Sequence, residues 1–88
     1  LNLVPSTATA GNLTKNGVPF LHNFGAQNTF VGVNAGNFTM TGGGNTASGA
    51  QALLSNSTGD SNTASGLAAL RSATTGFQNT ANGAVKTG

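Results

Sequence analysis

Side chains able to carry out acid–base catalysis or to bind a metal are scarce in this chain of 88 residues. His22 is the one histidine, Asp60 is the one residue with a carboxylate side chain, and cysteine is absent. A catalytic triad or a zinc site needs several such groups brought together. We therefore predict that the chain is not an enzyme and has no cofactor or metal site. His22 is expected to be packed or solvent-facing, and Asp60 to lie in a solvated turn.

Gly42–Gly44 form the segment that superficially resembles a phosphate-binding loop. Such a loop continues with lysine and then serine or threonine, whereas Asn45 and Thr46 follow here. The three glycines are therefore predicted to form a corner of the chain.

Charged side chains are too few to form an electrostatic binding surface. They are Lys15, Asp60, Arg71 and Lys86, and the formal net charge is +2. Nucleic acids and anionic membranes are bound by clustered lysine and arginine, so neither is an expected partner. No apolar run approaches the roughly 18 residues that a membrane helix requires, so we expect no membrane insertion in this segment.

Three Asn-x-Ser/Thr sequons, at Asn12, Asn37 and Asn56, are candidate N-glycosylation sites in a secreted chain. In a bacterial protein they would be coincidences of a sequence rich in asparagine and threonine. The sequence leaves both interpretations open.

The strongest pattern is a repeat with a period of 17 residues, which divides the chain into units 28–44, 45–61, 62–78 and the partial unit 79–88. A short fixed period indicates stacked units of one supersecondary element each. Four positions recur strictly. Position one is Asn28, Asn45, Asn62 and Asn79, position two is Thr29, Thr46, Thr63 and Thr80, position five is Gly32, Gly49, Gly66 and Gly83, and position fifteen, in the three complete units, is Gly42, Gly59 and Gly76.

The units are predicted to be all-β, because their recurring glycine, serine, threonine and asparagine each disfavour a helix by roughly 0.5–1 kcal/mol. Apolar residues return at positions three, six, eight and nine, which suits short strands separated by corners. A path of roughly 56 Å per unit, at about 3.3 Å per residue, matches one coil of a parallel β-solenoid or β-roll with two strands. The asparagines are expected to form a ladder of side-chain hydrogen bonds, the threonines a second ladder, and the glycines the corners.

Residues 1–27 lack the regular spacing and are predicted to be an N-terminal capping or connecting segment for the array. The core of one such chain would be thin, so we expect copies of the chain to associate. We also expect residues 1–88 to be a piece of a longer polypeptide.

The motif Asn-Thr-Ala-Ser-Gly-x-x-Ala-Leu, at 45–53 and 62–70, is followed by Ser-Thr-Gly at 57–59 and Thr-Thr-Gly at 74–76. Together these motifs resemble the YadA-like head repeats of trimeric autotransporter adhesins and of long repeat proteins from environmental bacteria. The resemblance covers 28–88, although the period here is longer. It implies a left-handed parallel β-roll, a homotrimer around a common axis, and an extracellular or cell-surface location with a role in attachment.

The leading functional hypothesis is a non-enzymatic structural segment of an extracellular bacterial fibre or surface adhesin, with a host or environmental surface or glycan as partner. One alternative is a self-polymerising filament subunit whose copies associate head to tail. Another is an ice- or glycan-binding β-solenoid, in which the threonine row orders water.

Overall fold

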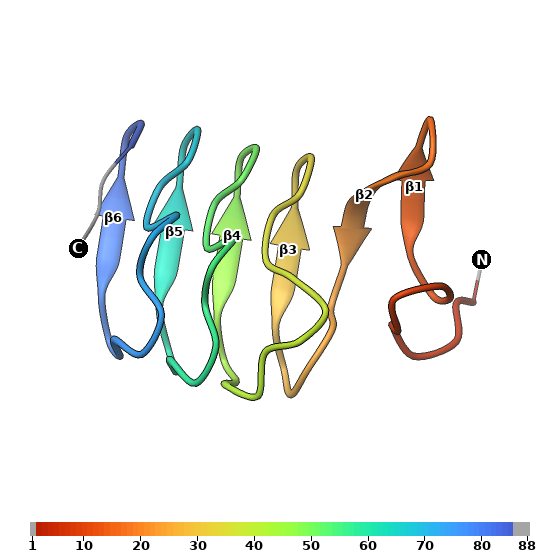
Figure 1. The fold of residues 1–88 in the computed structure, drawn as a ribbon, viewed down its shortest axis with the longest axis horizontal. Coiled ribbons are helices and arrows are strands. Elements are labelled where there is room, and N and C mark those ends of the chain that lie inside the picture. The colour runs from red at the N-terminus through yellow and green to blue at the C-terminus, as the bar shows by residue number, and fades with distance from the viewer. Residues whose placement is uncertain (1, 86–88) are drawn as a thin grey trace.

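The computed structural model describes residues 2–85 and shows an all-β fold, as predicted (Figure 1). The strands form one six-stranded sheet whose spatial order is the chain order. They are β1 (Leu13–Lys15), β2 (Val18–His22), β3 (Thr29–Val31), β4 (Thr46–Ser48), β5 (Thr63–Ser65) and β6 (Thr80–Asn82). Residues 2–85 contain no helix that could cross a membrane. The molecule measures 33 × 23 × 18 Å and is longest along the row of strands.

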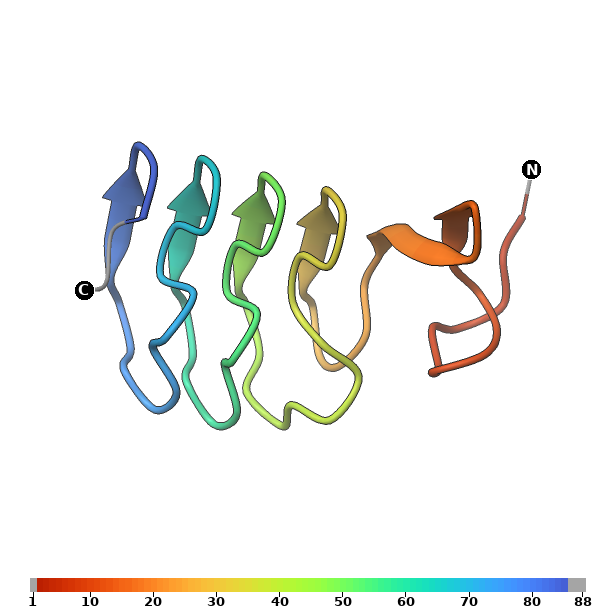
Figure 2. The same cartoon turned by 45° about the horizontal axis from the view of Figure 1, so that its top comes forward.

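Strands β3 to β6 are parallel, and residues 17 apart in the sequence lie directly opposite one another. Thr46 pairs with Thr29 on one side and with Thr63 on the other, and Thr63 then pairs with Thr80. After each strand the chain leaves the sheet, crosses beside it and returns to begin the next strand (Figure 2). The sequence period is therefore the register of the parallel strands.

The connecting segments also bond to the equivalent segment of the next unit. The backbone N–H of Leu53 donates to Ala69 O at 3.0 Å, and that of Ser55 donates to Arg71 O at 3.1 Å. These segments are nevertheless not strands, so the prediction of two strands per unit is wrong. The reason is that residues such as Leu53 and Leu70 have φ of 55° and 51°, in the left-handed region, which interrupts an extended backbone.

The core is a narrow column between the sheet and the connecting segments. The central residue of each parallel strand points inward, as the exposed–buried–exposed pattern of β3 to β6 shows. Ala47 and Ala64 fill these positions in β4 and β5, and Leu53 and Leu70 complete their layers from the connecting segments with no exposed surface. Alternation in the strand thus places position three inside.

Position six is also apolar in the sequence, but its larger side chains face solvent. Val33 and Leu67 retain 42% and 58% of their surface exposed. Gly32 and Gly66, with φ of 133° and 125°, turn the chain immediately after the strand, so the inward–outward alternation does not continue through the corner. The core is therefore built from positions three, eight and nine.

The first connecting segment departs from the others. It swings toward β2 in both views, whereas those after β4 and β5 follow a common path (Figures 1 and 2). Phe30 replaces alanine at position three, and Phe24, Phe38 and Met40 gather near it. His22 also packs here, with its ring centroid 4.9 Å from Phe30 and 4.4 Å from Phe38. These larger side chains close the N-terminal end of the core.

Residues 2–27 contain an antiparallel hairpin. β1 pairs with β2, and β2 pairs antiparallel with β3, so the parallel arrangement begins at β3. Asn16 and Gly17 form the two-residue turn. Their φ values of 52° and 78° are both positive, as a type I′ hairpin turn requires. A register shift after Leu13 makes the edge strand β1 irregular, and Pro19 lies in β2, between β1 and β3. An irregular edge strand discourages pairing with another sheet.

Candidate functional site

The four recurring asparagines are joined from unit to unit by hydrogen bonds. The side-chain oxygen of each one accepts the backbone N–H of the next, 17 residues on. The distances are 2.8 Å from Asn45 N to Asn28 Oδ1, 2.9 Å from Asn62 N to Asn45 Oδ1 and 3.0 Å from Asn79 N to Asn62 Oδ1. The ladder is therefore one of side chain to main chain, not of side-chain amide to side-chain amide.

The side-chain nitrogens of Asn28, Asn45 and Asn62 form hydrogen bonds within their own units. Each donates to the carbonyl of the glycine 14 residues on, at position fifteen. The pairs are Asn28 with Gly42 at 3.1 Å, Asn45 with Gly59 at 2.9 Å and Asn62 with Gly76 at 2.8 Å. Because Asn45 and Asn62 are fully buried, these bonds satisfy groups that would otherwise be costly to remove from water.

Glycines at positions five and fifteen are the places where neighbouring units approach most closely. A Cβ placed on Gly49 would lie 2.5 Å from Gly66 O, and one on Gly42 would lie 2.0 Å from Gly59 O. The position-five glycines Gly32, Gly49, Gly66 and Gly83 all have positive φ, between 106° and 133°. Space and backbone conformation both require glycine at position five. Position-fifteen glycines act through their carbonyls, a role that only the three-dimensional arrangement reveals.

The outer face of the parallel strands presents two rows of exposed side chains. The first row is Thr29, Thr46, Thr63 and Thr80, and the second is Val31, Ser48, Ser65 and Asn82. Within residues 2–85 the hydroxyls of the threonine row make no hydrogen bond to another protein group, so they are free to bind water. Neither row contains an aromatic residue.

An apolar continuation of the second row crosses the N-terminal hairpin. Leu13 lies opposite Leu21, and Leu21 lies opposite Val31. Their exposed fractions are 40%, 37% and 37%. The second row is thus polar over β4 to β6 and apolar over β1 to β3.

His22 is packed inside the fold and held by both ring nitrogens. Nε2 lies 2.9 Å from Ala35 O, and Nδ1 accepts the backbone N–H of Phe24 at 3.2 Å. These partners assign the ring hydrogen to Nε2. Burial lowers the pKa of His22 below its ordinary value, partly offset by the Ala35 carbonyl. Because both nitrogens of the neutral imidazole are hydrogen-bonded, neither is free for catalysis or metal binding.

The charged side chains of residues 2–85 make their contacts in separate parts of the structure. Asp60 Oδ1 accepts the backbone N–H of Gly43 at 2.7 Å, and Arg71 Nη1 donates to Gln51 Oε1 at 3.1 Å. Lys15 Nζ lies 5.4 Å from the centre of the Phe20 ring. No three metal-binding side chains come together in the part of the chain that the structure describes.

The nitrogen atoms of all three sequon asparagines are engaged in hydrogen bonds. Asn12 Nδ2 donates to Thr7 O at 2.8 Å, and Asn37 Nδ2 donates to Asn56 O at 2.7 Å. Asn56 is 1% exposed, and its Nδ2 donates to Gly59 O at 3.1 Å. A glycan is attached through this nitrogen, so modification of Asn56 would require its side chain to leave the core.

A cavity of about 550 Å³ lies between the N-terminal segment and β2. Its wall combines the apolar residues Leu3, Val4 and Pro5 with the uncharged polar residues Asn23 and Thr29. His22 also lines it, but both ring nitrogens of this side chain are already hydrogen-bonded, to Ala35 O and Phe24 N–H.

Comparisons with protein-family models, with curated proteins and with solved structures found no match to this chain.

Proposed function

We propose that each 17-residue unit is one coil of a parallel β-solenoid or β-roll, and that the chain is a non-enzymatic structural segment of an extracellular bacterial fibre or surface adhesin. One observation carries the proposal: residues one period apart pair directly in the strands, and backbone hydrogen bonds also join the connecting segments of neighbouring units. A chain organised in this way lengthens without changing its cross-section when units are added. This is the geometry of a stiff rod or spacer.

Hydrogen bonds along the row of units support the mechanical part of this role. The asparagine ladder adds a side-chain bond to every backbone pairing, for example from Asn62 N to Asn45 Oδ1 at 2.9 Å. Separating two units would expose several buried donors and acceptors together, which opposes bending and local opening. Adhesion would then arise from many weak, equivalent contacts along the rod acting together.

The proposed partner is the same chain, in a homotrimer. Apolar side chains remain exposed at position six, where Val33 and Leu67 lie, and over the hairpin at Leu13 and Leu21. The core is thin, and exposed apolar patches of this kind are typical of protein interfaces. The distribution supports a closed assembly in which position six faces a neighbouring copy.

Light scattering coupled to size-exclusion chromatography tests this assembly. We expect three times the chain mass, independent of protein concentration, and a monomer for Leu67→Asp. Thr63→Asp is the matched control, because Thr63 is exposed on β5 but lies in the threonine row, outside the proposed interface. A monomeric wild-type chain would reject the trimer and leave the coil architecture standing.

Attachment is tested by coating beads with the chain and measuring their retention under flow on glycan-coated and abiotic surfaces. Retention should rise steeply with coating density, because many weak contacts must act together. Retention equal to that of uncoated beads on every surface would reject the adhesive role while leaving a purely structural one.

The self-polymerising filament is less well supported. Head-to-tail growth would bring β6 of one copy against the edge strand β1 of the next, where the register shift after Leu13 discourages pairing. A mass that increases without limit as concentration rises would favour the filament over the trimer.

The water-ordering alternative is supported by the exposed threonine row in register across four strands. Glycan binding is less favoured on this face, because its two rows lack aromatic side chains on which sugar rings could stack. Thermal hysteresis on cooling, reduced by Thr63→Lys, would support ice binding, and its absence would remove that option.

A further inference from the structure

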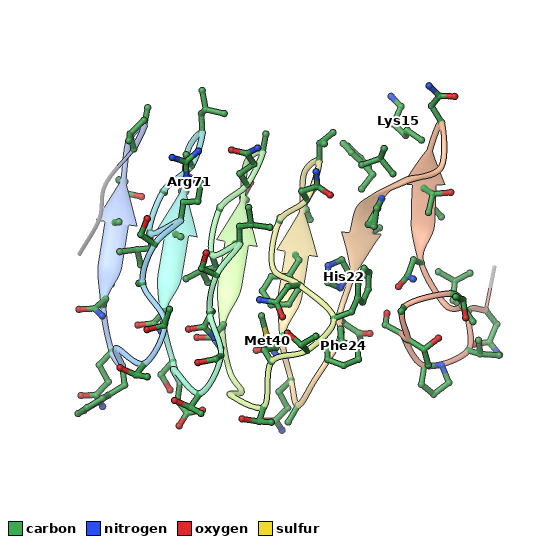
Figure 3. All side chains as sticks on the ribbon, viewed as in Figure 1. Lys15, His22, Phe24, Met40 and Arg71 are labelled. Carbon is green, nitrogen blue, oxygen red and sulfur yellow. The ribbon has the colours of Figure 1, made fainter. Side chains whose placement is uncertain are left out.

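His22 occupies the junction between the N-terminal hairpin and the first unit. It is the last residue of β2, and its ring lies between the rings of Phe30 on β3 and Phe38 on the first connecting segment. Only 5% of its surface is exposed. The side chain therefore belongs to the hairpin but is buried against the unit that follows (Figure 3).

At this junction one ring nitrogen of His22 donates a hydrogen bond and the other accepts one. Nε2 donates to Ala35 O in the first connecting segment, and Nδ1 accepts from the N–H of Phe24. A protonated imidazole carries a hydrogen on each nitrogen and can only donate. Protonation would thus remove the acceptor for Phe24 and set two N–H groups against each other 3.2 Å apart.

Among residues 2–85, no anionic group is placed to stabilise the protonated ring. Lys15 on β1 is the only other ionisable side chain between residues 2 and 44, and it has the same sign of charge. Asp60 bonds to Gly43 and Arg71 bonds to Gln51 in later parts of the array. The faces of Phe30 and Phe38 would attract a cation, but this attraction is smaller than the loss of hydration on burial.

The boundary between β2 and β3, which we call the seam, has few paired residues. β2 and β3 are paired at two positions, Leu21 with Val31 and His22 with Phe30, whereas each pair of parallel strands matches at three. Two further backbone bonds cross it, from Gly32 N to Phe20 O and from Asn34 N to Pro19 O. A change at His22 therefore affects a large share of the contacts between hairpin and array.

We propose that His22 is a pH-sensitive latch, which clips the N-terminal hairpin onto the first unit when neutral and releases it when the ring is protonated. Release would uncover the edge of β3 and the Phe24, Phe30 and Phe38 rings, while units 45–61 and 62–78 stay paired. An exposed strand edge beside aromatic surface is a site for pairing with another chain. The latch acts within one chain, so it stands whether or not the chain forms trimers.

The direction of the pH effect follows from the lowered pKa of His22. Its ordinary value is 6.5, and burial holds the folded value below that. The open form then binds more protons than the closed form between the two values. The closed latch is consequently most stable above pH 6.5 and weakens as pH falls below it, by up to about tenfold per pH unit. The loss ends below the folded pKa.

Hydrogen exchange of the whole chain, followed by NMR from about pH 7.5 to about pH 4.5, tests the proposal across the range in which histidine titrates. The amides of Gly32 and Asn34 report the seam, and that of Gly66, which donates to Ser48 O, reports the array. After correction for intrinsic exchange, protection at Gly32 and Asn34 should fall with acidification, and protection at Gly66 should not. Loss at all three amides at the same pH would mean global unfolding and overturn the latch.

His22→Gln provides the matched variant, because glutamine can donate and accept hydrogen bonds but does not titrate in this range. It should abolish the pH dependence at Gly32 and Asn34, and persistence of that dependence would overturn the proposal. Direct titration of the His22 ring signals in the wild-type chain is a second readout, which does not depend on the variant folding. A pKa at or above 6.5 would also refute the latch.

Discussion

Phe30 and Gly36 share the volume of one core layer, since a Cβ placed on Gly36 would lie 2.6 Å from Cδ2 of the Phe30 ring. In the two following units the large side chain comes from position nine in the connecting segment, and alanine occupies position three in the strand. The corresponding pairs are Ala47 with Leu53 and Ala64 with Leu70. The same cross-section is thus filled from the strand in the first unit and from the connecting segment in the others.

This exchange predicts that Phe30→Ala and Gly36→Leu are each destabilising and that the double variant is much less so. Phe30→Ala should cost roughly 3–5 kcal/mol through the cavity it leaves. Leucine is compatible with the backbone at Gly36, whose φ of 63° is close to the 55° of Leu53. Denaturant unfolding of the four proteins in a double-mutant cycle measures the coupling. Additive effects would contradict the shared volume.

Removing one step of the asparagine ladder should destabilise the fold in proportion to the buried groups left unpaired. Asn45→Ala leaves Asn62 N–H without its acceptor, whereas Gly59 O keeps the side-chain nitrogen of Asn56 as a donor, and one unpaired buried group costs about 1–3 kcal/mol. Asn45→Asp restores the acceptor but turns a carboxylate toward the Gly59 carbonyl, so it should not rescue stability. Ser48→Ala, on the exposed face of β4, is the control. Equal midpoints for Asn45→Ala and this control in urea would refute the prediction.

A methyl group at Gly49 should disrupt pairing between units. The added Cβ would meet Gly66 O at 2.5 Å, and φ is 131°. At Gly17 nothing lies within 4 Å of an added Cβ, although φ is again positive at 78°. Gly17→Ala should therefore cost about 1–2 kcal/mol from the backbone alone, and Gly49→Ala distinctly more. Thermal unfolding of both variants compares the two sites, and similar losses would contradict the prediction that Gly49 is required by the close approach of the next unit and by its backbone conformation.

The left-handed residues of the connecting segments offer a route to a more stable chain. Ser61 has φ of 57°, is exposed, and occupies the position that Gly44 fills in the preceding unit with φ of 70°. Ser61→Gly relieves about 1–2 kcal/mol of strain and incurs roughly 0.5–1 kcal/mol of extra chain entropy. A net gain of up to about 1 kcal/mol is expected.

Ser48→Gly is the matched control for this gain, because Ser48 lies on an extended strand and should be destabilised by the same change. Guanidinium unfolding of both variants gives the comparison. A loss of stability in both would mean that Ser61 is not strained.

Periodicity was enough to predict the all-β class and the pairing partners of the parallel strands. Equal chain lengths between Asn28, Asn45 and Asn62 return the backbone to equivalent places, so residues one period apart meet. Glycine at position five could likewise be assigned to a corner, because a strictly recurring glycine in a turn marks a backbone that other residues rarely adopt.

Side-chain direction and hydrogen-bond partners were decided by the tertiary structure. Alternation predicts which side chains face inward only while the backbone stays extended, and Gly66, with φ of 125°, ends the extended backbone immediately before Leu67, which is why Leu67 faces outward. The asparagine oxygen reaches a main-chain N–H, because the next unit brings its backbone, not its side chain, within 2.9 Å. The burial of His22 depends on Phe38, which joins it only when the first connecting segment swings toward β2. Because His22 lies outside the repeat, its contacts carry no periodic signal, and no spacing in the sequence could reveal them.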